Sequence, residues 1–228
     1  MRRLMIASLV GAITLLIAVT GCKGSDSTSD TQSPGDRLAK AKQSFDDADY
    51  IGFTLSTEQL PSDLEGLLSA KGTGTHDPAF TGEVKIQAAF DITAPVIAVD
   101  GKVYAKLPFS PYSEIDPAKY GAPNPADLMG GDNGISSLFT ATESPKTGDS
   151  TRDGETVLTE IDGTLAGKAV QGVFPSAGTA DFDVTYTLTD ANSIDKVKIT
   201  GPFYDGYDDV TYTIDLDLAA EPVDINAP

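Results

Sequence analysis

The sequence holds one cysteine, one histidine and no tryptophan among its 228 residues. One cysteine excludes a disulfide framework, and one cysteine with one histidine excludes a Cys/His zinc site and a Cys–His nucleophile. Lys and Arg number 16 against 34 Asp and Glu, for a formal net charge of −18. This acidic excess, without a basic stripe, argues against nucleic acid as a partner. Hydrophobic residues still make up 40% of the chain, so it is not a disordered polyelectrolyte.

The first residues have the pattern of an export and anchoring signal. Arg2 and Arg3 precede the uncharged, mostly apolar segment 4–19, which ends in Val19-Thr20-Gly21-Cys22. The apolar run is shorter than the ~20 residues of a spanning helix, so it predicts a cleaved signal peptide. Small residues before the only cysteine resemble a bacterial lipobox, which implies cleavage before Cys22 and its acylation with diacylglycerol and a palmitate-type chain. The alternative is an ordinary secretory signal with a chance cysteine.

Three segments follow from this signal: a lipoprotein signal peptide at 1–21, an acylated Cys22 with a flexible tether at 22–35, and a single domain at 36–228. The tether is rich in Ser, Thr, Asp and Gly and has no apolar periodicity. Two or three acyl chains hold a protein stably on a bilayer. We therefore expect the protein to be lipid-anchored at the outer face of the cytoplasmic membrane, in the cell envelope.

Most of the domain alternates apolar and polar residues, which is typical of antiparallel strands with one wet face. The clearest example is Thr81 to Ile92, and Asp100-Gly101 is a two-residue hairpin signal. We count about seven to nine such strands. The polar stretch Ser144–Asp153 is interpreted as a loop, and Leu60–Leu68, which is broken by Pro61, as a loop or a short turn of helix. Helices are expected near residues 36–48, 124–140 and 168–174, the first with Asp36 as its N-cap. An edge strand is expected at Lys71–Pro78.

These elements predict an α+β fold, a curved antiparallel sheet in the form of a half-barrel, with short helices covering its concave face. Two further turns support the helix positions. Asp116-Pro117 and Asn124-Pro125 each place a capping side chain before a proline at the first helical position.

The centre of the chain resembles the mycobacterial LprG/LprA/LprF/LppX lipoproteins of actinobacteria. Four segments carry the resemblance in order: Val19 to Cys22, Gly82 to Ile86, Val99 to Leu107, and Asn124 to Leu128 leading to Gly134-Ile135. The resemblance implies a half-barrel around a large hydrophobic cavity that binds the acyl chains of di- or triacylated lipids, glycolipids or triacylglycerol. It also implies outward transport of these lipids, in some members beside a membrane lipid exporter.

With such a cavity, the apolar faces of the alternating strands would form its lining, and the small alanines would leave room for acyl chains. The predicted lining residues are Val84, Ile86, Ala88, Val96, Ala98, Val103, Ala105 and Leu107. The alternative is a solid core, since every half-buried sheet has an apolar face.

Enzymatic chemistry finds little support in the sequence. His76 lies in a Gly/Thr/Asp-rich stretch and is expected to be an exposed loop residue rather than a general base. The acidic turns around Gly206 and at Asp132-Asn133 do not have EF-hand spacing, and no Ser-hydrolase, P-loop or zincin motif is present. We therefore predict no catalytic residue, metal or cofactor. The predicted function is a lipid carrier; the alternatives are an adaptor lipoprotein with a solid core and an envelope hydrolase.

Overall fold

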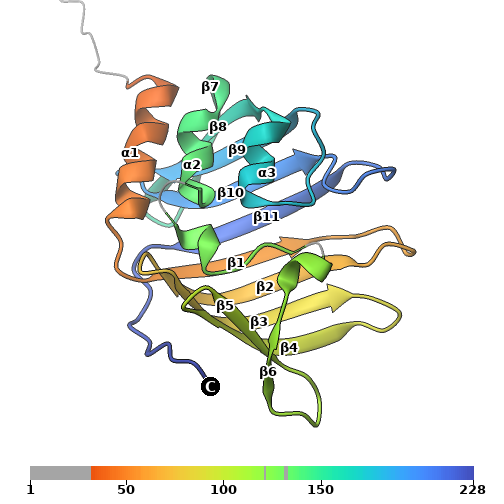
Figure 1. Cartoon of the computed structure of the whole chain (residues 1–228). Coiled ribbons are helices and arrows are strands. Elements are labelled where there is room, and N and C mark those ends of the chain that lie inside the picture. Colours follow the sequence, from red (N-terminus) through yellow and green to blue (C-terminus); the bar gives the residue numbers. More distant parts are fainter. Residues whose placement is uncertain (1–31, 121, 131–132) are drawn as a thin grey trace, which may run out of the picture. The chain divides into compact units, whose positions relative to one another are not determined.

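The computed structural model describes residues 32–120, 122–130 and 133–228. Their main element is one 11-stranded antiparallel sheet with strand order β6-β5-β4-β3-β2-β1-β11-β10-β9-β8-β7 (Figure 1). One half holds β1 (Ile51–Thr57), β2 (Gly66–Thr75), β3 (Ala79–Gln87), β4 (Ile92–Val99), β5 (Lys102–Lys106) and β6 (Tyr112–Ile115). The other half holds β7 (Glu143–Asp153), β8 (Thr156–Leu165), β9 (Phe182–Thr189), β10 (Ile194–Gly201) and β11 (Val210–Asp217). The two halves join where β1 pairs with β11.

Short helices cover one face of this sheet. Over the β7–β11 half lie α1 (Pro34–Asp46), α2 (Ile135–Ala141) and α3 (Gly167–Val173) (Figure 1). The segment with the 3₁₀ turns η1 (Pro117–Tyr120) and η2 (Asp127–Met129) crosses the β1–β6 half. The sheet is open, because β6 and β7 are its two edges and do not pair with each other. The predicted α+β half-barrel with helices on its concave face is confirmed.

The strand count of about seven to nine was too low, because two strands lie at the edges of the sheet. The predicted loop Ser144–Asp153 is wrong, since these residues belong to β7. Most β7 side chains are exposed, and its pairing with β8 is interrupted by register shifts. The other missed strand, β6, has only four residues. An edge strand with both faces wet carries no apolar alternation, so the sequence pattern hides it.

The predicted edge strand Lys71–Pro78 is also wrong, because β2 lies inside the sheet between β1 and β3. It begins at Gly66, within the segment predicted as a loop or a short turn of helix. Its glycines obscure the strand pattern, yet Gly72 has a structural reason. It pairs with Gly82 of β3, and a Cβ on Gly72 would lie 2.6 Å from Cζ of Phe80. The absence of both side chains lets the Phe80 ring cross the two strands.

The first helix begins at Pro34, two residues before the predicted N-cap Asp36. Ser33 is the N-cap: its Oγ accepts the backbone N–H of Asp36 at 3.1 Å and donates to the Asp36 carboxylate at 2.7 Å. Asp36 thus supports the cap from the first turn, where its charge favours the helix N-terminus. The signal peptide, Cys22 and most of the predicted tether lie outside the described residues and stay predictions.

Other local predictions are confirmed, with one exception. Asp100 and Gly101 both adopt positive φ, 54° and 73°, in the turn that joins β4 to β5. The side chain of Asp116 accepts the N–H of Ala118 at the start of η1, which begins at Pro117. Asn124 likewise accepts the N–H of Ala126, but the prediction of a helix that begins at Pro125 is wrong, because η2 begins at Asp127 with Ala126 as its N-cap. The helices predicted near 135–139 and 168–174 are α2 and α3.

Aromatic side chains fill the space between the helices and the β7–β11 half. Phe45 of α1 and Tyr186 of β9 both contact Phe139 of α2 edge-on. A second group surrounds Phe203, which touches Phe174, Phe182 and Tyr212 at centroid distances of 4.9–5.6 Å. This half is therefore a solid core, and it anchors the helices against the sheet.

Candidate functional site

The inner face of the β1–β6 half includes rows of small residues beside its larger apolar side chains. Read across the strands, Gly72 lies opposite Gly82, Gly82 opposite Val96, and Val96 opposite Ala105. In the next row Val84 lies between Ala70 and Ala94. Such short side chains fill little of the space between the sheet and its cover.

A first pocket lies between this face and the cover formed by Pro117, Ala122, Pro123, Pro125 and Leu128. Every lining side chain is apolar, and the free volume is about 40 Å³. From the sheet it is lined by Phe53, Leu55, Leu67, Ala70, Val84, Ile86, Val96, Val103 and Ile115. Nothing in the wall offers a polar group to a ligand, so the pocket suits hydrocarbon.

A second pocket adjoins the first on the same face and has a volume of about 130 Å³. It shares Val84, Ile86 and Ile115 with the first, so both lie against the same three side chains. Its remaining lining residues are Glu65, Gly66, Ala88, Ile92, Ala94, Ala105 and Leu107. Ile92 and Leu107 are exposed, which places an opening of this pocket at the end of the sheet where β3 and β5 finish.

The structure places seven of the eight predicted lining residues on the wall of a pocket: Val84, Ile86, Ala88, Val96, Val103, Ala105 and Leu107. Ala98 is the exception, because it is fully buried opposite Phe80 and lines neither pocket. Contact of these residues with lipid stays a prediction.

Sequence reasoning missed the walls contributed by β1, β2, β6 and the cover. The alternation of Phe53 and Leu55 was a usable signal for β1. The proline-rich cover has neither a helical nor a strand period, so no pattern pointed to it.

The pockets are narrower than the large cavity that the resemblance implied. Volumes of about 40 and 130 Å³ fall below the ~300–1,000 Å³ of typical ligand sites. The face is thus neither a plain core nor a ready-made cavity. Acyl chains would fit only if the cover moved away from the sheet.

One buried hydroxyl ties the pocket floor to the solid half of the sheet. The Tyr212 hydroxyl donates to the carbonyl of Leu67 at 2.6 Å and lies 2.8 Å from the Tyr204 hydroxyl. Burial, with a smaller effect from Tyr204, raises the pKa of Tyr212 above its usual value. Burial likewise raises the pKa of Tyr186, whose hydroxyl donates to Leu138 of α2. Both tyrosines stay neutral and act as fixed donors.

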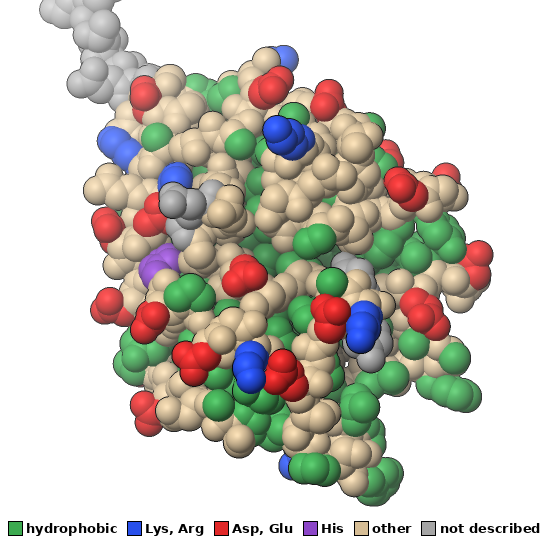
Figure 2. All heavy atoms as spheres, viewed as in Figure 1, with side chains coloured by type: hydrophobic (Ala, Val, Ile, Leu, Met, Phe, Trp, Pro, Cys, Tyr) green, Lys and Arg blue, Asp and Glu red, His purple; other side chains and the backbone are tan. Residues whose placement is uncertain are grey.

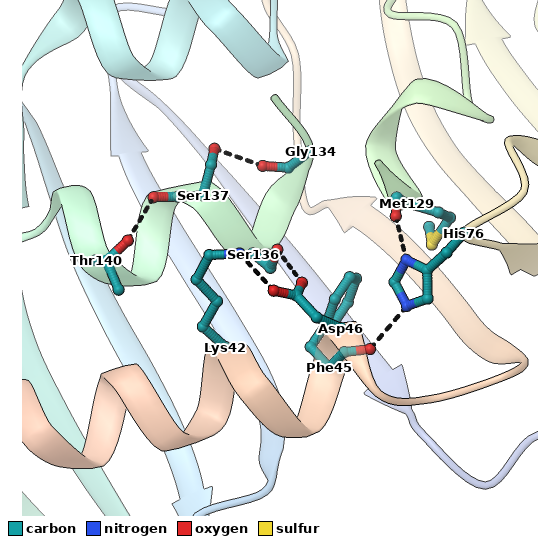
Figure 3. Close-up of polar contacts among 9 residues, drawn as sticks. All are labelled: Lys42, Phe45, Asp46, His76, Met129, Gly134, Ser136, Ser137 and Thr140. Carbon is teal, nitrogen blue, oxygen red and sulfur yellow. Dashed lines mark hydrogen bonds and ion pairs between the residues drawn. The ribbon is translucent and has the colours of Figure 1, made fainter. Parts of the chain in front are cut away.

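His76 is not the exposed loop residue that the sequence suggested. It is half-buried in the β2–β3 turn, with Nδ1 2.6 Å from the carbonyl oxygen of Met129 and Nε2 2.9 Å from that of Phe45 (Figure 3). Both ring nitrogens thus face a carbonyl oxygen, and a nitrogen that carries a hydrogen donates it to the carbonyl in front of it. His76 therefore joins the hairpin to the end of α1 and to η2, at one end of the cover.

A second polar cluster joins α1 to α2. Asp46 pairs with Lys42 and accepts a hydrogen bond from Ser136 Oγ at 2.7 Å (Figure 3). Serine, lysine and aspartate together resemble the parts of a nucleophilic site. Ser136 is fully buried, however, so a substrate has no route to its hydroxyl, and the cluster holds the helices together.

We expect His76→Leu to destabilise the fold by about 1–3 kcal/mol, because the polar contacts of the ring with the carbonyl groups of Phe45 and Met129 are lost. Urea unfolding measures this. The matched control is His76→Gln, which keeps one donor and should lose less. If His76→Leu unfolded at the same urea concentration as the wild type, the two bonds would contribute nothing net.

Within the described parts of the chain, no group of three or more His, Cys, Asp and Glu side chains is placed to hold a metal ion. The turn with Asp205, Asp208 and Asp209 is among these residues, whereas Asp132 lies outside them. A search of the same residues for a helix long and apolar enough to span a membrane also found none.

Comparison with known proteins identifies the family. The family model described as LppX_LprAFG lipoprotein matches residues 33–225. The chain belongs to this family. The resemblance seen in the four sequence segments is thereby confirmed, and membership in a lipoprotein family implies association with the cell envelope. No curated protein sequence matches the chain.

Two solved structures of LppX_LprAFG lipoproteins share the fold. LprF from Mycobacterium bovis is 15% identical, with a TM-score of 0.68 over 86% of this chain and 96% of that one. Lipoprotein LppX from Mycobacterium tuberculosis is 14% identical, with a TM-score of 0.62 over 85% of this chain and 98% of that one. At these identities the likeness establishes the half-barrel and leaves the ligand open.

Proposed function

We propose that this protein is a non-enzymatic carrier. It binds the acyl chains of a di- or triacylated envelope lipid, glycolipid or triacylglycerol between the β1–β6 half and its cover, and it moves that lipid outward from the cytoplasmic membrane. The observation that supports this most is the pair of adjoining, mainly apolar pockets that share Val84, Ile86 and Ile115. Anchoring through Cys22 and cooperation with a membrane lipid exporter belong to the same proposal and are supported by the family.

The energetics favour such a protein. Each methylene withdrawn from water gains ~0.8 kcal/mol, so exposing a 16-carbon chain costs about 12 kcal/mol. A lipid with two or three chains therefore needs an apolar escort across an aqueous gap. Such a carrier needs a broad apolar surface and no catalytic group.

Binding requires the pockets to widen, and the construction of the cover allows this. The hydrogen bonds of the η1–η2 segment include local ones, such as Asp127 N–H to Asn124 and Met129 N–H to Ala126. Its contact with the pocket runs through apolar side chains such as Leu128 and Pro125. An acyl chain can replace these contacts with equivalent ones, while the contact of His76 with the Met129 carbonyl holds the η2 end of the cover in place.

Mass spectrometry of lipids extracted from purified, non-acylated protein tests the proposal. We expect a di- or triacylated lipid to co-purify, and added lipid of that class to bind. Recovery of no lipid, together with no affinity for added diacyl or triacyl lipid, would contradict the carrier. The small pocket volumes would then favour the adaptor lipoprotein with a solid core.

A further inference from the structure

Two phenylalanines lie outside the core, on neighbouring hairpin connections. The chain has nine phenylalanines, and seven are buried. Phe90, between β3 and β4, is 85% exposed, and Phe109, between β5 and β6, is fully exposed. Exposure of an apolar phenylalanine ring to water is unfavourable, so two exposed rings on adjacent loops indicate contact with an apolar partner.

Both loops border the opening of the second pocket. β3 and β5 run in the same direction, because each is antiparallel to β4, so their following loops leave the same end of the sheet (Figure 1). Ala88 and Ile92 flank Phe90 in sequence, Leu107 precedes Phe109, and all three line the pocket. An apolar surface therefore continues from the pocket wall to the two exposed rings.

The backbone holds Phe109 outward. Its φ of 64° lies in the left-handed region, which a bulky residue rarely adopts. The turn is closed by a hydrogen bond from Ser110 N–H to the carbonyl of Leu107 at 3.1 Å, and Pro108 and Pro111 restrict its flanks. The loop is thus a fixed projection.

Charge separates this surface from the rest of an acidic protein. The loops 88–91 and 107–111 contain one ionisable residue, Asp91, and Lys85 Nζ pairs with it at 2.9 Å. Lys106 stands at the base of the second loop, beside the Tyr112 ring. In Figure 2 hydrophobic side chains gather along the lower right edge, where these loops lie.

The acidic groups lie elsewhere. At the opposite end of the sheet, Asp49, Asp77, Asp100 and Asp224 surround a groove. At the end of the sheet that carries Phe90 and Phe109, acidic residues lie on the β1–β2 and β10–β11 connections. Glu65, on the first of these, lies on the wall of the second pocket. An anionic bilayer would therefore repel most of the molecule and accept the side formed by β3 to β6.

We propose that the Phe90 and Phe109 loops form a tip that inserts into the surface of a lipid bilayer. Aromatic rings are favoured at that depth, between headgroups and hydrocarbon. The tip brings the opening at Ile92 and Leu107 against the acyl chains of the leaflet, so a chain enters the pocket without crossing water. This role rests on the proposed carrier function, since it supplies the route by which the pocket is loaded.

The lack of native tryptophan provides a direct test. Phe90→Trp and Phe109→Trp are made separately in the full-length acylated protein and reconstituted in phosphatidylcholine–phosphatidylglycerol vesicles with brominated acyl chains. Both tryptophans should be quenched. The control is Tyr50→Trp, just before β1 at the opposite end of the sheet, which should stay unquenched. Equal quenching at positions 50, 90 and 109, or none at 90 and 109, would overturn the proposal.

A second measurement tests the consequence for loading. In the double variant Phe90→Ser/Phe109→Ser, protein-dependent transfer of an acyl-labelled lipid between vesicles should slow by about tenfold or more for each ring, since burial of one Phe is worth one to two factors of ten. Binding of the same lipid from detergent solution should not change. Transfer at the wild-type rate would overturn the inference, and a variant defective only in cells would indicate a protein partner instead.

The two proposals fail in different ways. If the wild type binds no lipid from detergent, the carrier function is wrong whatever the tryptophans report. If it binds lipid but the tryptophans at positions 90 and 109 are not quenched, the carrier function is retained and the proposed bilayer tip is wrong.

Discussion

Val84→Trp is expected to abolish acyl-chain binding while the protein still folds. Val84 lines both pockets, and its cross-strand neighbours are the small Ala70 and Ala94. An indole at this position would occupy the free space that the two pockets share. In a face with room for it, the ring should change the free energy of unfolding by less than about 1 kcal/mol; in a close-packed face it should cost about 1–3 kcal/mol or more. Titration with a fluorescent fatty acid and urea unfolding of the same variant measure both quantities.

Two further variants make this result specific. Ala88→Trp lies in the second pocket alone and should also block binding. Ile97→Trp is the matched control, because Ile97 alternates with Val96 and Ala98 on β4 and lines neither pocket. It should bind like the wild type. If Val84→Trp bound lipid as well as Ile97→Trp does, the pockets would not be the binding site.

The parts of the fold that could be predicted from sequence are those where one face of a strand is wet and the other dry. In β9 the alternation of Phe182, Val184, Tyr186 and Leu188 with polar residues matches a strict buried–exposed pattern. The Asp100-Gly101 turn was predictable for a local reason, since few residue pairs tolerate two positive φ values in succession. In these places the local sequence alone determines the conformation.

The missed parts depend on partners that are distant in the sequence. β7 is a strand only because β8 pairs with it, and its exposed side chains show no period. The two carbonyl partners of His76 lie on α1 and η2, far from it in the chain. The wall that β2 and β3 share arises from the register that sets Ala70 against Val84, which no pattern within either strand reveals. Seven of the predicted lining residues lie on a pocket wall, because they alternate on β3, β4 and β5 or just beyond their ends, and their contact with lipid stays a prediction.

The two halves of the sheet differ in packing: the β7–β11 half is filled by aromatic rings, and the β1–β6 half contains free space. Under α1–α3, aromatic rings pack edge-on and join the helices to each other and to the sheet, so this half holds the helices in place. Under the cover, short side chains and prolines leave gaps that hydrocarbon can enlarge.

Gly82→Ala is expected to reduce the stability of the protein by about 2–4 kcal/mol, a large effect for one added methyl group. A Cβ on Gly82 would overlap the carbonyl oxygen of Lys71 and lie 2.7 Å from both Cζ of Phe80 and Cα of Gly72. Two of these three atoms belong to the backbone of β2, so relief requires the strands to separate.

The control for this change is Gly172→Ala in α3, where an added Cβ meets nothing within 4 Å. In a helix this replacement should stabilise the protein by roughly 0.5–1 kcal/mol. Urea unfolding of both variants therefore compares the same added methyl in two environments. Equal stability of Gly82→Ala and the wild type would mean that β2 and β3 separate freely. In that case the floor of the pockets, as well as the cover, would yield to an incoming acyl chain.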